Sequence, residues 1–155
     1  MVDTIQELSK LSLKLNQKSD QLNVLITSIN KKLGAMNLGV EVWLGDKPLE
    51  MGETKHRPDE QDCDVMYQEG RVLGYCRIGG SWQLGLKTCW YDFVDAGCEA
   101  EPTTLAGSEE PLLGASRLNR IKALELLPEL LDQIKARAQK MLESIESAEK
   151  AAEEH

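Results

Sequence analysis

Residues 71–93 read RVLGYCRIGGSWQLGLKTCWYDF, and this stretch decides the fold. Two runs of β-branched, aromatic and other large apolar residues flank the pair Gly79-Gly80, which is a signal for a tight turn. A two-residue turn there places Leu73 opposite Leu86, because the turn sets the register of the two strands. The stretch therefore predicts a β-hairpin.

Two further strands are predicted on the amino-terminal side of the hairpin. The pair Glu69-Gly70 is a second turn signal, so a strand that begins at Cys63 precedes it. The run GVEVWL at 39–44 is β-branched and aromatic, and a long polar loop separates it from the others. The sequence thus predicts a four-stranded antiparallel meander.

The alternation of side chains along these strands separates two faces. One face carries most of the large apolar residues and is expected to meet the helices. The opposite face is half polar. Gly74 lies opposite Gly85 on this face, so no side chain covers the backbone at these two positions. The apolar face comprises Met66, Leu73, Tyr75, Trp82, Leu84, Leu86 and Trp90.

A long amphipathic helix is predicted before the sheet. Residues 3–33 contain no Pro or Gly, and Gly34 is a plausible stop. Apolar residues recur at heptad intervals, with Lys18 and Lys32 where an apolar residue is expected. The stripe comprises Leu8, Leu11, Leu15, Leu22, Leu25, Ile29 and Met36.

A second long helix is predicted after the sheet, with Ser116 as its N-cap. A heptad stripe runs without a break from Leu124 to Ala152. Pro128 removes a backbone donor, which predicts a kink or a division into two helices. The predicted fold class is therefore α+β in a single domain, 1–155: helix 1–36, four-stranded antiparallel β-meander 37–115 and kinked helix 116–155.

The charge of the chain is unevenly distributed. The 155 residues have a formal net charge of −8. Residues 37–115 contain fifteen acidic and six basic residues, whereas 1–36 contains three acidic and five basic ones. Direct binding of nucleic acid is therefore disfavoured, because phosphate contacts require a concentrated basic surface. The acidic centre instead suits a basic protein partner.

The sequence contains few motifs that would indicate a metal site or a cofactor. The four cysteines lack a CxxC pair, which disfavours a zinc site, and no phosphate-binding or dinucleotide-binding glycine motif indicates a cofactor. No apolar run approaches the length of a membrane helix, and the first residues do not resemble a signal peptide. We therefore expect a cytoplasmic protein with no metal, no cofactor and no membrane span.

Cys63 and Cys76 are a candidate redox pair. A turn at Glu69-Gly70 places Cys63 directly opposite Cys76, with Cα atoms about 4.5 Å apart if the pair is not hydrogen-bonded. That spacing is near the lower edge of what a disulfide accepts. In a reducing compartment, two buried thiols are the alternative interpretation.

The function favoured by these patterns is non-catalytic. We expect an interaction, adaptor or regulatory module that forms a homodimer through its helices and presents the acidic centre, with inhibition of a nucleic-acid-binding partner as one role. The interface residues predicted from the heptads are Leu22, Leu25, Ile29, Leu127, Leu131, Ile134, Ala138, Met141 and Ile145.

The alternative is a small-molecule-binding protein or an enzyme that uses the second face of the sheet. A dimer that closes over this face would create the concave, partly apolar site that ligands need. The candidate ligand-binding residues are Tyr67, Gly74, Gln83, Gly85 and Lys87.

Overall fold

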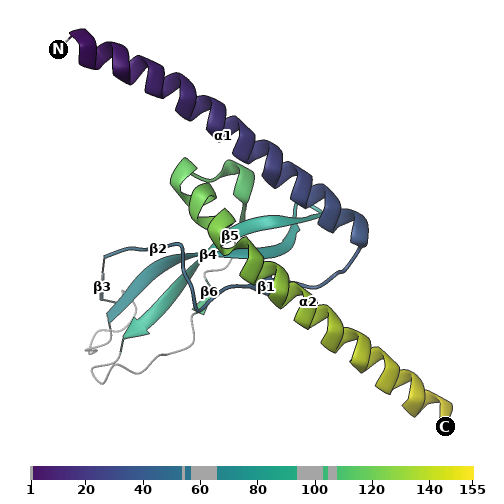
Figure 1. The fold of residues 1–155 in the computed structure, drawn as a ribbon. Coiled ribbons are helices and arrows are strands. Elements are labelled where there is room, and N and C mark those ends of the chain that lie inside the picture. The colour runs from purple at the N-terminus through teal and green to yellow at the C-terminus, as the bar shows by residue number, and fades with distance from the viewer. Residues whose placement is uncertain (1, 54, 57–65, 94–102, 105–107) are drawn as a thin grey trace.

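The computed structural model describes residues 2–53, 55–56, 66–93, 103–104 and 108–155. A long helix comes first, an antiparallel sheet follows, and a second long helix comes last (Figure 1). The predicted α+β fold class is therefore confirmed. The elements are α1 (Val2–Met36), β1 (Val42–Trp43), β2 (Glu50–Met51), β3 (Lys55–His56), β4 (Met66–Ile78), β5 (Ser81–Phe93), β6 (Thr103–Thr104), β7 (Glu110–Pro111), the 3-10 turn η1 (Leu112–Gly114) and α2 (Arg117–Glu153).

The centre of the sheet is the β4–β5 hairpin, in which Leu73 pairs with Leu86 as predicted. Gly79 and Gly80 form the turn with φ values of 58° and 84°. Two consecutive positive φ values match the twist of a hairpin and are accessible to Gly at little steric cost. The strand order β1-β4-β5-β6 is that of a meander, with β2, β3 and β7 paired along its edges.

The predicted turn at Glu69-Gly70 is wrong, because β4 runs straight through these residues. Glu69 pairs with Trp90 and Gly70 pairs with Cys89, so both residues keep a partner on β5. A Cβ on Gly70 would lie 2.6 Å from a ring carbon of Tyr91. Glycine is therefore required here for the close approach of an aromatic ring and not for a turn.

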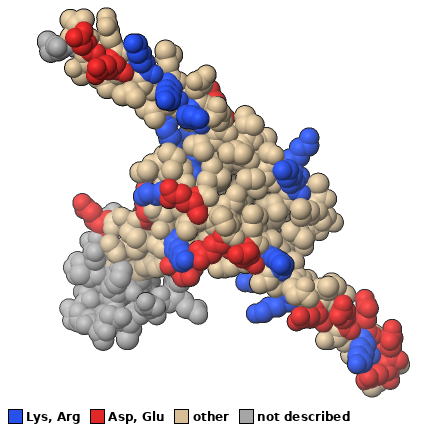
Figure 2. All heavy atoms as spheres, viewed as in Figure 1, with Lys and Arg blue, Asp and Glu red and all other residues tan. Residues whose placement is uncertain are grey.

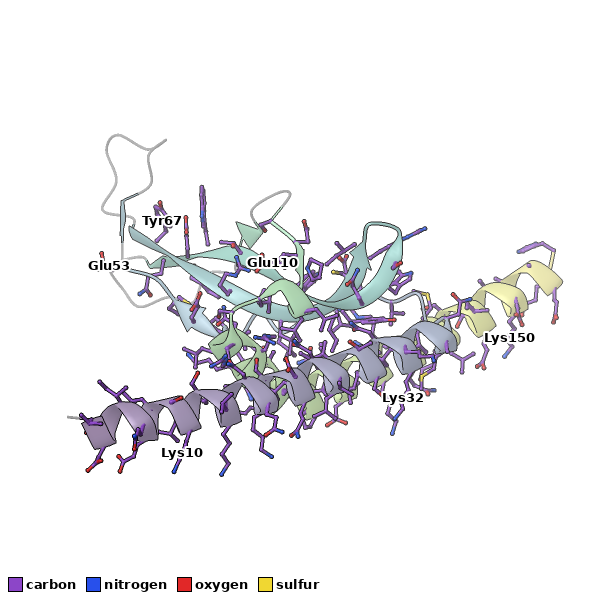
Figure 3. All side chains as sticks on the ribbon, turned by 90° about the horizontal axis from the view of Figure 1, so that it is seen from above. Lys10, Lys32, Glu53, Tyr67, Glu110 and Lys150 are labelled. Atoms are coloured by element: carbon purple, nitrogen blue, oxygen red, sulfur yellow. The ribbon has the colours of Figure 1, made fainter. Side chains whose placement is uncertain are left out.

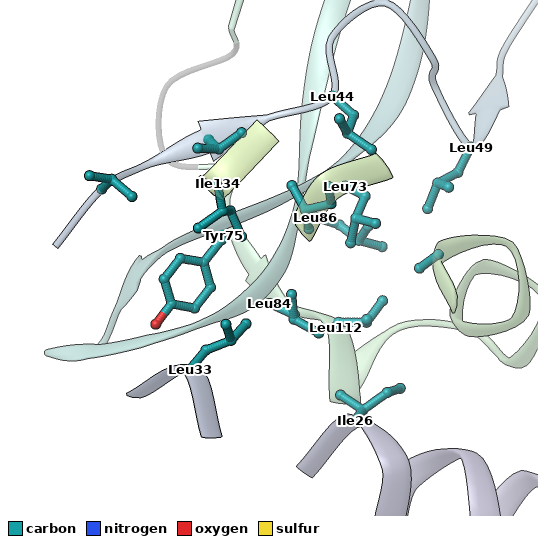
Figure 4. Packing of buried hydrophobic residues seen from close by; sticks show 14 residues of the cluster. Ile26, Leu33, Leu44, Leu49, Leu73, Tyr75, Leu84, Leu86, Leu112 and Ile134 are labelled. Carbon is teal, nitrogen blue, oxygen red and sulfur yellow. The ribbon is translucent and has the colours of Figure 1, made fainter. Parts of the chain in front are cut away.

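Both helices pack on one face of the sheet (Figure 3). Leu73, Tyr75, Leu84 and Leu86 are buried on this face, as the alternation predicts, and Trp82 stacks on Tyr75 with ring centroids 5.6 Å apart. The side chain of Met66 is outside the described part of the structure. Figure 4 shows that the core also receives Ile26 and Leu33 from α1, Leu44 and Leu49 from the segments around β1, Leu112 from η1 and Ile134 from α2.

The buried face of α1 differs from the predicted stripe. Ser19, Ile26 and Leu33 are buried at intervals of seven residues. Leu25, next to Ile26, is 53% exposed, and Figure 3 shows Lys32 pointing away from the sheet. Within the part of α1 that covers the sheet, Leu22 and Ile29 of the predicted stripe are thus partly buried, whereas Leu25 and Met36 are exposed. Asn30, on the inner side, accepts a hydrogen bond of 2.8 Å from the backbone N–H of Leu84, a donor at the edge of β5.

The helix α2 begins at the predicted N-cap, where the Ser116 hydroxyl accepts a 3.2 Å hydrogen bond from Asn119 N–H. It continues through Pro128 to Glu153, so a division into two helices at Pro128 is wrong. Leu130 and Ile134, within two turns after Pro128, are buried against the sheet. Their packing holds the chain helical, because tertiary burial outweighs the loss of one backbone donor.

The two helices run in the same direction (Figure 1), and the residues in contact are about 100 positions apart in the sequence. Arg117 donates to Asn16 at 3.0 Å, and Arg120 donates to Ser19 at 3.2 Å, both across 101 positions of sequence. Arg120 also donates to Asn23. Where the two helices are in contact, residues of α1 therefore lie beside residues of α2 that are 97–101 positions later.

This offset leaves part of each helix without an intramolecular neighbour. Residues 2–15, here called the α1 arm, precede the start of α2. Residues 139–153, called the α2 arm, continue past the end of α1. Every residue of both arms is exposed, and Figure 1 shows them extending from opposite ends of the molecule. At 1.5 Å per residue, each arm is about 21–23 Å long.

Candidate functional site

The α1 arm exposes a stripe of large apolar side chains. Leu8, Leu11 and Leu15 are 59%, 55% and 52% exposed, and Ile5 is 63% exposed. These residues lie on or beside the face that packs on the sheet farther along α1, because Ile5 and Ile26 are three heptads apart. The apolar face of α1 thus continues beyond the sheet that it covers.

The α2 arm has a shorter apolar stripe. Met141, Leu142 and Ile145 are each about half exposed, at 48%, 48% and 49%. Farther along, the stripe continues with Ala148 and Ala152, which offer less apolar area per turn.

An apolar groove lies where the end of α1 meets the base of the α2 arm. It has a volume of about 440 Å³ and is open on one side. Its walls come from the last turns of α1 and from the middle of α2. They include Leu33, Met36, Leu131, Ile134, Ala138 and Leu142.

The predicted interface residues fall into two groups. Ile134 is only 2% exposed and packs mainly within its own chain, and Leu22, Ile29, Leu127 and Ala138 are partly buried. The remaining members are exposed on the helices and are free to meet another chain. They are Leu25, Leu131, Met141 and Ile145.

The sheet face proposed for a ligand is filled by the protein itself. Trp43 pairs with Gly74, and its indole lies where a side chain on Gly74 would be. The ammonium group of Lys87 lies 4.3 Å from the centre of the same ring, a cation–π distance. Gln83 donates to the carbonyl of Ile78 at 3.1 Å. The backbone at Gly74 is therefore covered by Trp43, and the space at Gly85 is taken by Ile78 and Glu110.

The prediction that Tyr67 shares a sheet face with Gly74 is wrong. In the continuous strand β4, Tyr67 is an odd number of residues from Gly74, so the two side chains project from opposite faces. Tyr67 is buried and packs against Trp90, with ring centroids 5.1 Å apart. The error follows from the turn predicted at Glu69-Gly70, because that turn would have reversed the chain between them.

The predicted redox pair lies partly outside the described residues, because Cys63 is not among them. Cys76 is opposite Gln83 on β5 and is a free thiol. Its side chain is buried, and this burial, reinforced by the nearby carboxylates of Glu41 and Glu109, raises the pKa of the Cys76 thiol to about 11. A buried thiol with a raised pKa is a poor nucleophile near neutral pH.

We expect native Cys76 to resist alkylation at pH 8, because both burial and its raised pKa suppress the thiolate. Brief treatment with iodoacetamide followed by peptide mass spectrometry should show Cys76 modified only after addition of denaturant. Cys89 is also buried, at 2% exposed, and should likewise be modified only after addition of denaturant. Rapid modification of Cys76 in the folded protein would contradict this placement.

The charges on the two arms follow opposite orders along the chain. The α1 arm has Asp3 and Glu7 first, then Lys10 and Lys14. The α2 arm begins with Lys140 and is then mainly acidic, with Lys150 among four glutamates at 143, 146, 149 and 153. Figure 2 shows acidic side chains at the start of α1 with basic ones behind them, and acidic side chains over the far part of α2. Figure 3 shows Lys10 and Lys150 at opposite ends of the molecule.

The acidic centre is only partly within the described residues. Glu50 and Glu53 lie in and just after β2, and Glu110 of β7 forms an ion pair with Arg71. Many of the other acidic residues of 37–115 fall within 57–65 and 94–102, which are outside the described part.

Comparisons with protein-family models, with curated proteins and with solved structures find no match to this chain. Among the described residues, no three His, Cys, Asp or Glu side chains are grouped so that they would hold a metal ion. In the same residues, no helix has the length and apolar character needed to cross a membrane.

Proposed function

We propose that this protein is a non-catalytic interaction module that self-associates through its two helices, with a homodimer as the minimal assembly. The observation that carries the proposal is the exposed apolar stripe on each arm, formed by Leu8, Leu11 and Leu15 on α1 and by Leu142 and Ile145 on α2. Single exposed apolar residues are ordinary, but a continuous stripe along one helix face is typical of a surface that pairs.

The length of the arms supports the same proposal. Each arm has 14 or 15 residues, all of them exposed within the chain. In proteins, most helical stability comes from packing of an apolar face and not from propensity, so an arm gains stability from a second helix against it. Association would bury the apolar stripes and hold both arms helical.

The second part of the proposal concerns the acidic centre. With fifteen acidic and six basic residues, 37–115 offers electrostatic complementarity to a basic protein in the cytoplasm. An adaptor role follows if that partner is recruited to the oligomer. An inhibitory role follows if the acidic surface occupies a basic groove that otherwise binds nucleic acid. The ligand-binding alternative has less support, because Trp43 fills the space above Gly74.

Self-association is tested by sedimentation velocity of the full chain over a range of micromolar concentrations. We expect the weight-average mass to rise with concentration above that of the 17.3 kDa monomer. A variant with Leu8→Gln and Leu142→Gln should remain monomeric, because it removes one large apolar residue from each arm. Both residues are exposed within the chain, so the fold should be unaffected.

The matched control is Leu13→Gln. Leu13 is 71% exposed on the α1 arm but lies 140° around the helix from Leu8, given 100° per residue. This variant should associate like the natural chain. A natural chain that stays monomeric at every concentration would refute the self-association proposal.

A further inference from the structure

We propose that the partner of the α1 arm is the α2 arm of a second copy of this chain, with the two arms parallel and the copies arranged head to tail. This inference rests on the proposed self-association and specifies its geometry. It is carried by three independent features: the position of the groove, the matched lengths of the arms and the order of their charges.

The groove marks the place where a second helix would continue the line of α1. Because the helices have an offset of 101, Met36 at the end of α1 lies beside residue 137 of α2. The groove opens at this point, between Met36 and Leu142. A helix laid along the α2 arm from here onward would follow the path that α1 takes along the earlier part of α2.

The α1 arm of another copy has the length and the surface to occupy this path. It has 14 residues against 15 in the α2 arm, so neither would leave a long unpaired end. Its first apolar side chains, Ile5 and Leu8, would enter the groove or lie against Leu142 and Ile145. These four residues are all about half exposed or more within one chain.

The charge order favours the parallel direction. In a parallel pair, Asp3 at the start of the α1 arm lies near Lys140 at the base of the α2 arm, whereas Glu7 lies near Glu143. The later residues Lys10 and Lys14 of the α1 arm then lie near the glutamates at 146, 149 and 153. Opposite charges on neighbouring helices favour one pairing direction and exclude others, although each exposed pair contributes only about 0.2–1 kcal/mol.

A reciprocal two-fold dimer of the same arms is disfavoured by these charges. A two-fold axis perpendicular to the helices would make the α1 arm antiparallel to the partner's α2 arm. Asp3 would then lie near the acidic end of the α2 arm, and Lys14 near Lys140. Like charges would meet at both ends of the contact, and like-charge pairs on helices are destabilising.

The head-to-tail contact is heterologous, so each added copy leaves one arm free at each end. Such contacts produce rings where the rotation closes and open filaments where it does not. A contact two heptads long is smaller than a standard interface of about 800 Å² per partner, so each contact is expected to be weak. The assembly should therefore grow gradually with concentration beyond two copies.

The test uses two full-length variants, each defective in one arm. The first carries Ile5→Gln and Leu8→Gln, and the second carries Leu142→Gln and Ile145→Gln. Each variant alone should sediment as a monomer, because its one intact arm finds no intact complement. An equimolar mixture should form a one-to-one complex and grow no further, since the two remaining arms are both defective.

A natural chain that stops at a dimer at every concentration would indicate reciprocal two-fold pairing and overturn the head-to-tail inference, because that pairing would also give a one-to-one complex in the mixture. If the second variant dimerises alone and the mixture forms no one-to-one complex, the α1 arms pair with each other. Dimerisation of the first variant alone would indicate α2–α2 pairing. Both results overturn the head-to-tail inference but keep the proposed self-association, as does a mixture that stays monomeric while the natural chain associates. If the natural chain is itself monomeric, both proposals fail. Circular dichroism of each variant controls for folding.

Discussion

Replacing Ile26 with Ala should lower the free energy of unfolding by about 2–5 kcal/mol, the usual cost of truncating a fully buried Ile. Ile26 is 0% exposed and lies in the core with Leu84 and Leu112. The same change at the adjacent Leu25, which is 53% exposed, should cost less than about 0.5 kcal/mol. The heptad pattern alone makes the opposite assignment, because Leu25 belongs to the predicted stripe and Ile26 does not.

Urea denaturation monitored by circular dichroism would measure both variants. Dilute protein should be used, so that association through the arms does not add to the stability of the natural chain. Ala is a better helix former than Leu or Ile, so a large loss at Ile26 can only come from lost packing. Equal effects at the two positions, or a larger effect at Leu25, would show that α1 is rotated differently on the sheet.

A second large effect is expected at Gly74. A Cβ here would overlap the indole of Trp43 and lie 2.6 Å from the carbonyl oxygen of Val42. Gly74→Ala should therefore destabilise the protein by about 1–3 kcal/mol, the typical cost of overpacking. The cost should be unusually high for so small a change, because an Ala methyl group is normally tolerated on a strand.

The matched control is Gly34→Ala, since a Cβ at Gly34 meets nothing within 4 Å. Gly34 is inside α1, so this variant should gain about 0.5–1 kcal/mol from helix propensity. A double-mutant cycle with Trp43→Ala tests whether the overlap with Trp43 causes the loss of stability in Gly74→Ala. Once the indole is removed, Gly74→Ala should cost less by about 0.5–3 kcal/mol, the range of coupling between residues in contact. Additive effects would mean that Trp43 does not lie over Gly74.

Predictions from local signals were accurate where one structural solution dominated. The pair Gly79-Gly80 predicted both a turn and the pairing of Leu73 with Leu86, because two residues with positive φ almost require this geometry. The turn predicted at Glu69-Gly70 was wrong because a glycine can have either of two structural roles. It permits a turn, and it also makes room for a neighbour, here Tyr91, whose approach across the sheet is not visible in the sequence around Gly70.

The candidate interaction surfaces on the helices were also predicted only in part from local sequence. Heptad spacing correctly indicated two long helices, and the exposed members of the stripes are the basis of the proposed interface. The polar residues on the buried face of α1 gave no such signal. Ser19 and Asn23 face α2 because Arg120 binds both, and this contact joins positions about 100 residues apart. No local pattern around Ser19 marks it as an inward-facing residue.

The sequence by itself determined the two long helices, the register of the central hairpin and the α+β class, because these depend on spacing and turn chemistry within a few residues. Only the tertiary structure decided how α1 is rotated, how far the helices are offset and which face Tyr67 occupies. A heptad stripe allows several rotations that bury similar apolar area, so distant contacts choose among them. The offset that the contacts of Arg117 and Arg120 show is what leaves both arms exposed.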